Sequence, residues 1–470
     1  MWLVVKFLNF KYNNPMNDYH QKFASLGLNV PSILLPKTEN LHKWPVIACD
    51  QFTQDRGYWE KAKSIVNSSP SSLNLIFPEV FLSDNDASQR IGNIHSTMKR
   101  YLQDGVFSEP RQGFIYIERD TPYQKKRRGL VAAVDLEMYD WHPESRLPIR
   151  ATEGTVPERL PPRMDIRRRA PLELPHVLLL IDDENDAFLP SLGERAKKND
   201  PCYNTQLMMD SGGVTGWFID EKEDGMFSFI AEQLGDLHRR SKSRYDGDTA
   251  GEPFLFAVGD GNHSLAAAKG IWEEYKAKNA DETDLLLHPC RYALVEIENI
   301  YDPAIQFEPI HRVVFDIGFD QTVSLLSKMP DFSCHPVNSA KELADAVRSQ
   351  VYKNSASANC FGLISEGRYA LVETSASGIA TACLQPLLDS YTGNNPQLID
   401  YIHDEKEVFR LSCAGENYCG KEKIAGILLP PVRKSGLFET VARGGPLPRK
   451  SFSMGHSREK RFYLEGRELT

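Results

Sequence analysis

Metal-binding and disulfide patterns are sparse in this chain of 470 residues. Its eight cysteines are scattered, no two of them form a C-x-x-C pair, and no histidines lie at zinc-finger spacing. These absences exclude the zinc-ribbon and zinc-finger classes. An even cysteine count allows disulfides, but scattered cysteines in a long acidic chain are more typical of a reduced cytoplasmic protein.

Long apolar runs are also absent. The longest one near the N-terminus, Trp2–Leu8, is interrupted by Lys6 and is followed by a polar run. It is too short to span a membrane and lacks the cleavage site of a signal peptide, so we expect no membrane partner. Because Met16 opens a more ordinary start, residues 1–15 are interpreted as an upstream extension or a disordered tail.

Positive charge is in deficit over the whole chain. The 55 lysines and arginines are outnumbered by 64 acidic residues, which gives a net charge of -9. A surface that coats DNA or RNA is therefore excluded, and no nucleic-acid partner is expected. From residue 431 onward, nine basic residues face four acidic ones, so this block carries +5 and the remainder -14. We therefore expect the positive charge to be focused on one small anionic ligand.

Several motifs of well-known enzymes are missing. The chain contains no G-x-S-x-G nucleophile motif, and none of its cysteines lies in a recognisable catalytic setting. A serine or cysteine nucleophile with a catalytic triad is therefore not supported. These absences direct attention to carboxylates, histidines and phosphate-binding turns.

The length predicts more than one folding unit. We expect a first domain over residues 16–300 and a second over 301–470, with the boundary near Asn299–Pro303. The fold class is predicted to be α/β, with a mixed sheet in the N-terminal half and a C-terminal α+β half. The sequence carries no signal for an oligomeric state.

Apolar periodicity predicts the secondary structure. The expected strands are 44–50, 113–118, 130–136, 175–181, 216–219, 254–258 and 292–298, with a hairpin at 360–364 and 369–373. The expected helices are 57–66, 91–102, 226–238, 264–278, 315–329, 340–351 and 395–410. The continuous apolar run at 175–181 indicates a central strand that is covered on both faces.

The most informative segment joins a strand to a helix. A buried strand at 254–258 leads into the polar turn 259–263, and a helix over 264–278 follows. The free N–H groups and the positive dipole end at such a helix start attract phosphate. Neither a Walker motif nor G-x-G-x-x-G occurs in this turn, so it is not a standard nucleotide fingerprint.

Two side chains of the turn are suited to chemistry. Asp260 is suited to holding Mg²⁺ or a hydroxyl group, and His263 to donating to a phosphate or transferring a proton. The alternative is an ordinary helix start with Asn262 or Asp260 as its cap.

A second candidate is Glu153, which lies between Thr152 and Gly154 at the end of a predicted strand. An accessible carboxylate near arginines stays ionised and can take a proton from a substrate hydroxyl. The alternative is a solvated loop carboxylate. Arg163 belongs to a basic segment that is suited to clamping phosphate bidentately, or that is simply a solvated loop. The arginines of this segment are Arg159, Arg163, Arg167, Arg168 and Arg169.

Two candidates lie in the second half. His311 and Arg312 enter a buried run and are suited to holding substrate, although a structural pair packed against Glu308 explains them equally well. The segment 446–465 contains Lys450 and Ser451 among other basic, hydroxyl and aromatic residues. Its composition suggests a surface tail, and would also suit a flap over an anionic ligand.

Six motifs in order resemble domain of unknown function family 1015 from about Met16 to the C-terminus. They are WPVIACDQFT (44–53), RATEGTVPERLPPR (150–163), ELPHVLLLIDD (173–183), GDGNHSLAAAK (259–269), EPIHRVV (308–314) and the closing LPRKSFSMGHSREKRFYLE. That family is similar to the ADP-dependent free serine kinases and, through them, to the fold of ParB proteins and sulfiredoxin. The resemblance implies a ParB/sulfiredoxin-like N-terminal half.

The resemblance also implies roles for single residues. The turn of Asp260, Gly261, Asn262 and His263 corresponds to the nucleotide-phosphate turn of these relatives, with Ser264 next to it where the wider family has arginine. Glu153 corresponds to the carboxylate that activates the serine hydroxyl.

We therefore expect a nucleotide-dependent phosphotransferase that acts on a small hydroxyl compound, by resemblance free L-serine. ADP or ATP and Mg²⁺ are the expected cofactors. The alternatives are a non-catalytic nucleotide-binding regulatory module of ParB-like type and an unrelated small-molecule hydrolase.

Overall fold

The computed structural model describes residues 18–123, 126–222, 225–245, 253–349, 359–376, 378–393, 395–413 and 423–469. The chain divides into two compact units. Unit 1 comprises Met1–Ala151, Thr155–Ile305 and His456–Thr470, and unit 2 comprises Thr152–Gly154 and Gln306–Gly455. This grouping differs from the predicted second domain, 301–470, because the last residues pack with unit 1. The predicted extension, residues 1–15, lies outside the described residues.

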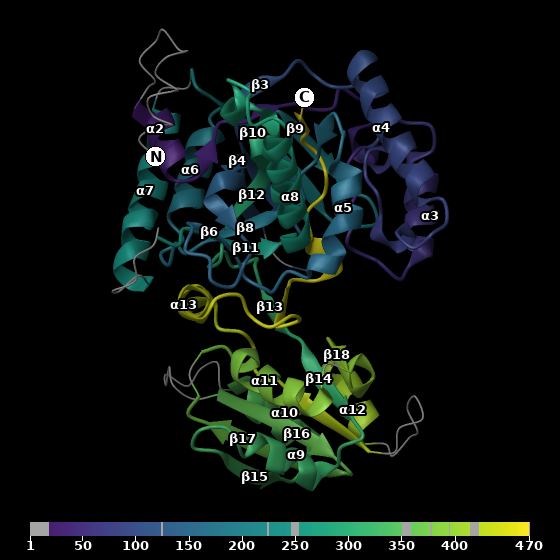
Figure 1. Cartoon of the computed structure of the whole chain (residues 1–470), viewed down its shortest axis with the longest axis vertical. Coiled ribbons are helices and arrows are strands. Elements are labelled where there is room, and N and C mark those ends of the chain that lie inside the picture. The colour runs from purple at the N-terminus through teal and green to yellow at the C-terminus, as the bar shows by residue number, and fades with distance from the viewer. Residues whose placement is uncertain are drawn as a thin grey trace. The chain divides into compact units, whose positions relative to one another are not determined.

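Unit 1 is built on an 11-stranded mixed sheet (Figure 1). The main path of the sheet runs β5-β6-β11-β8-β12-β4-β3-β10-β9, while β1 pairs with β4 and β2 with β3. The strands of unit 1 are β1 (Leu28–Asn29), β2 (Ser32–Ile33), β3 (Arg111–Asp120), β4 (Arg127–Asp135), β5 (Tyr139–Asp140), β6 (Ile149–Ala151), β7 (Leu172–Glu173), β8 (Leu178–Ile181), β9 (Tyr203–Gln206), β10 (Gly213–Asp220), β11 (Phe256–Asp260), β12 (Tyr292–Asn299) and β21 (Arg467–Glu468).

Helices complete unit 1. They are α2 (Asp18–Ser25), α3 (Arg56–Val66), α4 (Ala87–Gln103), α5 (Leu160–Arg167), α6 (Phe188–Ala196), α7 (Met226–Tyr245) and α8 (Asn262–Lys278). Within the described parts of the chain, no helix has an 18-residue stretch that is apolar enough to cross a membrane.

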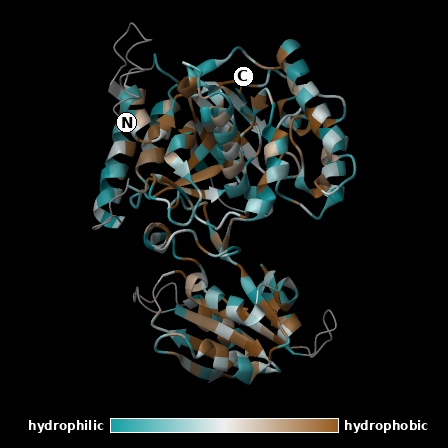
Figure 2. Cartoon of the chain, in the orientation of Figure 1, coloured by the Kyte–Doolittle hydropathy of each residue, from teal (hydrophilic) through white to brown (hydrophobic). Residues whose placement is uncertain are grey.

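Both faces of the large sheet are covered. Successive side chains of a strand point to opposite faces, so one strand contributes to both cores. In β3, Phe114 and Tyr116 pack into a core with α2, α6, α7 and α8. Ile115 and Ile117 pack into a second core with α3, α4 and the end of the chain. Figure 2 shows the hydrophobic colouring concentrated on the strands and the hydrophilic colouring on the outer faces of the helices.

Strand β8 lies in the middle of this sheet and positions the turn after β11. All four of its residues are fully buried, which confirms the prediction of a central strand covered on both faces. It runs antiparallel to β11 and parallel to β12. The register with β11 shifts between Val258 and Asp260, where Asp260 pairs with Leu178. This bulge re-aims the end of β11 before the chain enters α8.

The end of the chain is an integral part of unit 1. Strand β21 pairs with β7, and the indole of Trp44 donates to the carbonyl of Leu464 at 3.1 Å. From residue 459 to 469 almost every residue is buried. The prediction of a surface tail is therefore wrong for these residues, because their basic side chains face buried carboxylates.

Unit 2 contains a six-stranded antiparallel sheet in the order β15-β17-β16-β19-β14-β18. Helices α9 and α11 pack on one face and α10 and α12 on the other. The elements of unit 2 are β13 (Phe307–Pro309), β14 (His311–Phe315), α9 (Phe319–Leu326), β15 (Ser333–Val337), α10 (Ala340–Ser349), β16 (Asn359–Ser365), β17 (Arg368–Thr374), α11 (Ala380–Thr392), β18 (Ile399–Ile402), α12 (Glu405–Cys413), β19 (Ile424–Leu428), α13 (Lys434–Gly444) and β20 (Phe452–Met454). The chain is thus a mixed α/β protein, with a large mixed sheet and an antiparallel C-terminal sheet.

One predicted element is wrong, and two predicted helices are helical over only part of their expected ranges. Residues 44–50 form only an isolated bridge between Ile47 and Phe462 instead of a strand. The predicted helix 315–329 begins at residue 319, because Asp316 has a positive φ of 61° that breaks a helix. The predicted helix 395–410 contains strand β18, which pairs with β14 and precedes α12.

Candidate functional site

The strand-turn-helix of unit 1 forms where β11 ends and α8 begins. Gly261 has a φ of +80°, and a Cβ atom there would lie 3.1 Å from the Cα atom of Val177. Only glycine fits this close approach without strain. The Asp260 Oδ1 atom accepts a hydrogen bond from the Gly261 N–H at 3.1 Å. The N-cap residue of α8 is Gly261, which has no side chain to cap the helix, so the N-terminal amides and the positive dipole end favour an anion.

The other oxygen of Asp260 faces a lysine. Its Oδ2 atom lies 3.1 Å from the Nζ atom of Lys460, a residue near the end of the chain that is 7% exposed. Magnesium is usually held by several oxygen ligands in octahedral geometry, and here it would have to displace an ammonium group. Among the described residues, no three His, Cys, Asp or Glu side chains are grouped to hold a metal. The role of Asp260 as a Mg²⁺ ligand therefore stays a prediction, and Lys460 competes with it.

His263 lies in the first turn of α8, and its ring has a defined orientation. The backbone N–H of Val156 donates to its Nε2 atom at 3.2 Å. Because a backbone N–H can only donate, Nε2 must carry a lone pair, and the ring proton of the neutral form is assigned to Nδ1. The ring can therefore donate from Nδ1, while taking up a proton at Nε2 would break the contact with Val156.

Two polar atoms near this turn are buried without a hydrogen-bond partner among the described residues. They are the Oδ1 atom of Asn262 and the hydroxyl oxygen of Thr155. Buried polar atoms are usually paired with protein or with ordered water. The residues Asn262, His263 and Ser264 are each half-buried. The turn therefore has unfilled hydrogen-bonding capacity beside its helix dipole.

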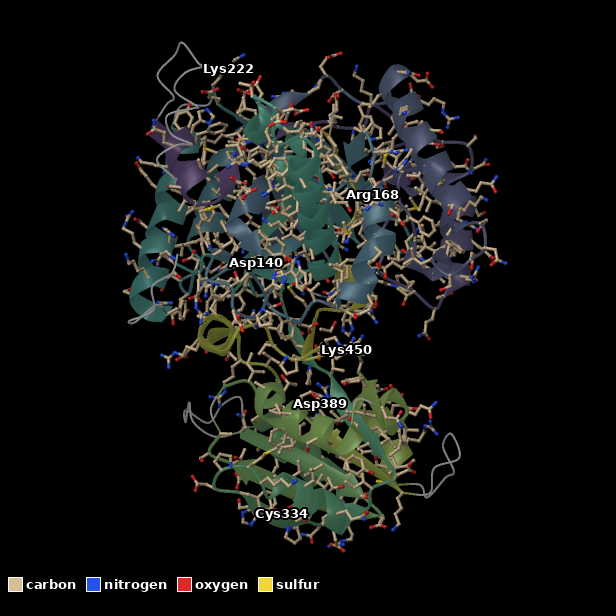
Figure 3. The ribbon with its side chains drawn as sticks, viewed as in Figure 1. Asp140, Arg168, Lys222, Cys334, Asp389 and Lys450 are labelled. Carbon is tan, nitrogen blue, oxygen red and sulfur yellow. The ribbon has the colours of Figure 1, made fainter. Side chains whose placement is uncertain are left out.

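Arg163 on α5 is engaged elsewhere in unit 1. Its guanidinium forms an ion pair with Glu79 and donates to the carbonyl of Arg159. Burial is the largest influence on Glu79 and raises the pKa of its carboxyl, while Arg163 acts in the opposite direction. Its neighbour Arg168 (labelled in Figure 3) is bound to Glu274 of α8. An anion that approached Arg163 would have to compete with a carboxylate.

A hydrogen-bond chain that the sequence reasoning missed lies behind the turn. A Cβ atom at Gly261 would lie 3.5 Å from the Cδ2 atom of His176, and the His176 Nδ1 atom lies 2.8 Å from the hydroxyl of Tyr463. The same hydroxyl accepts from the N–H of Cys49 at 3.1 Å, and the N–H of Glu79 donates to the carbonyl of Cys49. Hydrogen bonds therefore link four separate stretches of the sequence near Gly261.

One signal could have identified these residues. His176, Tyr463 and Cys49 each lie inside one of the six motifs quoted above, as does Lys460. Glu79 lies outside every motif, and no sequence pattern indicated it.

Glu153 belongs to unit 2. It forms a bridge with Leu447, where the N–H of Gly154 donates to the carbonyl of Leu447 at 3.1 Å. In return the N–H of Leu447 donates to the carbonyl of Thr152 at 2.7 Å. The Glu153 side chain is half-buried. Two backbone hydrogen bonds therefore fix the predicted catalytic carboxylate to a segment almost 300 residues away in sequence.

Arg312 of β14 is fully buried in the same unit. Its Nε atom donates to Gln385 at 2.9 Å, its Nη1 atom donates to the carbonyl of Ile310, and its guanidinium lies over the ring of Tyr401. Its Nη2 atom has no hydrogen-bond partner among the described residues. Burial lowers the pKa of Arg312 to about 10, and the charge of Glu153 acts against that decrease. Glu153 and Arg312 are therefore close enough to attract each other.

Of the other predicted substrate-binding residues, His311 and Ser451 are buried, whereas Lys450 is exposed. The N–H of Leu429 donates to the Nδ1 atom of His311, which is 4% exposed, and burial lowers its pKa to about 4. The Ser451 hydroxyl is 1% exposed, donates to the carbonyl of Pro448 and accepts from Thr381. Lys450 is exposed, with a φ of +60° (Figure 3).

The predicted residues thus form two groups. Unit 1 brings together the turn residues, with Lys460 as an unpredicted partner: Asp260, Gly261, Asn262, His263 and Ser264. Unit 2 brings Glu153 near Arg312, whereas His311 and Ser451 make internal hydrogen bonds. The roles assigned to all of these residues are still predictions.

Comparisons with solved structures find distant likenesses. A free serine kinase variant in complex with AMP is 11% identical and covers 71% of this chain and 90% of its own, with a TM-score of 0.35. A free serine kinase variant in complex with ADP covers 73% and 94%, with the same identity and TM-score. C-terminally truncated SbnI from Staphylococcus aureus is 9% identical over 71% and 82%, with a TM-score of 0.30. Such low TM-scores carry no argument about this chain.

The comparison with protein families is decisive. No curated protein matches the chain significantly. The family described as "Protein of unknown function (DUF1015)" matches residues 32–391, which is well over half of the chain. The chain therefore belongs to the DUF1015 family.

Proposed function

We propose that this protein is a nucleotide-dependent phosphotransferase whose acceptor is a small hydroxyl compound, by resemblance free L-serine. The turn 260–264 of unit 1 binds the phosphates of ADP or ATP, and Glu153 accepts the proton of the hydroxyl. In the transfer the acceptor oxygen forms a bond to phosphorus, the bond to the nucleotide oxygen breaks, and the proton passes to Glu153. On this proposal, unit 1 has a ParB/sulfiredoxin-like fold.

The uncapped start of α8 is the observation that carries the proposal. A left-handed glycine turns the chain directly into this helix, so that amide groups and the dipole meet at one point. Anions bind such helix starts readily. The buried Oδ1 atom of Asn262 and the hydroxyl of Thr155 lack partners among the described residues. A bound nucleotide and its water shell would supply them.

Phosphoryl transfer asks for positioning and electrostatics more than for covalent chemistry of the protein. Glu153 supports this assignment because hydrogen bonds to Leu447 fix its backbone, and Arg312 lies within electrostatic range. A half-buried carboxylate in such a setting is suited to orienting a hydroxyl group and taking its proton. Magnesium would enter with the phosphates of the nucleotide, because Asp260 is bound to Lys460.

The test uses the purified chain with ATP or ADP, Mg²⁺ and a panel of amino acids, and follows the release of ADP and AMP. Glu153→Gln removes the proton acceptor and keeps the shape of the side chain. Glu158→Gln is the matched control, because this exposed glutamate lies five positions later.

We expect turnover that falls by about 100-fold or more in Glu153→Gln and is unchanged in Glu158→Gln. Nucleotide binding without turnover of any acceptor would favour the regulatory module instead. A chain that binds neither ADP nor ATP would overturn the proposal.

A further inference from the structure

Lys460 is an unusual lysine. It is 7% exposed, and Asp260 is the one partner that the described residues give its ammonium group. An ammonium group has three donors, so a single carboxylate oxygen leaves capacity for further acceptors. Lysine is almost never buried unless its charge is paired and hydrogen-bonded. A buried and incompletely coordinated cation beside the start of α8 indicates a place for an additional anionic oxygen.

Two arginines of the large sheet donate hydrogen bonds to the backbone around Lys460. Arg119 of β3 donates to the carbonyls of Arg458, Glu459 and Lys460, and Arg127 of β4 donates to the carbonyl of Glu459 at 2.8 Å. Both arginines are 4% exposed. Their planar guanidinium groups thus fix three successive peptide groups, and with them the direction of the Lys460 side chain.

Two further cations of unit 1 are engaged in other contacts. Lys269 of α8 donates to the carbonyl of Leu136 at 2.8 Å and pairs with Glu273 at 2.7 Å. Arg163 pairs with Glu79. Lys460 differs from both because its carboxylate partner, Asp260, is itself part of the turn.

We propose that Lys460 is the phosphate-binding cation of the 260–264 turn, and that Arg119 and Arg127 are positioning residues that hold it there. When a nucleotide binds, the ammonium group of Lys460 donates to a phosphate oxygen. It either leaves Asp260 or donates to both groups. The inference rests on the proposed function in one respect: the turn must bind a nucleotide.

The experiment measures the affinity of the full chain for ADP by calorimetry. Lys460→Met removes the ammonium group and keeps most of the aliphatic volume, and we expect the affinity to fall by about 10- to 100-fold. Lys460→Arg keeps the charge and should restore most of the affinity. Lys269→Met, on the same helix as the turn, is the matched control and should bind ADP like the wild type. Melting temperatures of all variants establish that they fold.

Asp260→Asn gives a readout that a purely structural lysine would not produce. It keeps the acceptor for the Gly261 N–H and removes the charge that competes for Lys460. We expect tighter ADP binding in this variant, and no such gain when Lys460→Met is also present. Arg127→Lys should weaken ADP binding in the wild-type background and have no further effect beside Lys460→Met.

The outcomes separate the two proposals. If the wild type binds ADP and Lys460→Met binds it equally well, the role of Lys460 is overturned while the nucleotide site stands. If the wild type does not bind ADP, both fail. If Lys460→Met loses both its fold and its ADP affinity, the decision passes to Asp260→Asn, whose unchanged or weaker affinity would overturn the role of Lys460.

Discussion

At the scale of single residues, burial decides which predicted groups can act as charges. His311 and Arg312 are adjacent on β14 and both are buried, yet burial leaves the histidine neutral and the arginine charged. Desolvation always disfavours the charged form, and the ordinary pKa of arginine is so high that even a decrease to about 10 preserves its charge. His311 is therefore a structural acceptor at neutral pH, and Arg312 is the cation of this strand.

This difference predicts a pH dependence. The folded pKa of His311, about 4, lies below its ordinary value of 6.5, so the unfolded chain takes up a proton that the folded chain refuses. The stability from neutral His311 is fully present above pH 6.5 and is lost as the pH falls toward 4. His311→Asn keeps an acceptor for the N–H of Leu429 and cannot titrate, so it should flatten this loss, which amounts to about 3 kcal/mol at most.

Hydrogen exchange of the β14 and β19 amides at pH 7 and pH 4.5 measures this effect. His335→Asn is the control, because His335 belongs to the same unit and is exposed. Equal pH dependence in the wild type and in His311→Asn would contradict the assignment.

Gly261 supplies a prediction about backbone conformation. Alanine at this position would combine a positive φ with a Cβ atom 3.1 Å from both the Cα and Cγ2 atoms of Val177. We expect Gly261→Ala to lower the free energy of unfolding of unit 1 by about 2 to 3 kcal/mol. Gly105→Ala also has a positive φ, of +68°, with no atom within 4 Å of the added methyl group. This control should cost only about 1 kcal/mol, and equal losses in urea unfolding would argue against steric contact.

At the scale of elements, the segment from residue 456 to 469 has little regular structure but makes many polar contacts within unit 1. It donates and accepts hydrogen bonds along β3, β4 and β7 and brings Lys460 and Tyr463 to the turn. Its charged side chains pair with buried acidic groups of the sheet, so it behaves as a polar core.

Arg461 tests the importance of this polar core. It forms ion pairs with Glu296 and, at 2.5 Å, with Glu465, and it donates to the carbonyl of Pro175. Arg461→Met would leave two buried carboxylates without their cation, which should cost about 3 to 5 kcal/mol of unfolding free energy. Arg458→Met, at an exposed position of the same segment, should change it by less than about 1 kcal/mol. Similar urea midpoints for the two variants would show that the buried pairs contribute little.

Local pattern predicted most of the elements that lie near the candidate site. The periodicity of apolar residues was sufficient for α3, α4, α7, α8 and the hairpin of β16 and β17, because these elements bury one face against a nearby partner. It failed for residues 44–50 and for the closing segment, whose partners are more than 400 residues apart, as in the bridge between Ile47 and Phe462. No local window contains such a pairing.

The residues of the candidate site also fall into those that a local pattern predicted and those that it missed. The turn at Gly261 was recognisable because its glycines and polar residues separate a strand from a helix within twenty-five residues. Lys460, His176 and Glu79 were missed because only tertiary contacts bring them near that turn. Conversely, Ser451 and His311 were predicted to bind substrate, and in the structure both form internal hydrogen bonds.

At the scale of the whole molecule, the two units differ in how the chain enters them. Residues 306–455 form most of unit 2 in one continuous stretch, whereas unit 1 requires segments from both sides of it. Unit 2 has its own antiparallel sheet and two apolar cores. A unit with a contiguous chain and its own core can fold alone.

This asymmetry predicts the behaviour of fragments. Residues 306–455 expressed alone should keep native-like circular dichroism and protected amides in β14, β16 and β19. Residues 18–305 should be unstable or aggregate, because they lack the arginine and lysine partners of Glu296 and Asp260. Adding a peptide of residues 456–469 should recover part of the amide protection in β3 and β4. A stable fragment 18–305 without that peptide would contradict the prediction.

The position of Lys460 also matters for the order in which the protein is made. Domains commonly fold as they leave the ribosome, the N-terminal one first. Here the ribosome delivers β1 to β12 early, but the segment with Lys460, Arg461 and Tyr463 follows the whole of unit 2. A nascent chain that still lacks this segment therefore carries an unfinished sheet, in which Asp260 and Glu296 have not yet met their cationic partners. On the proposal made for Lys460, a partial chain without this segment should bind ADP more weakly than the full chain.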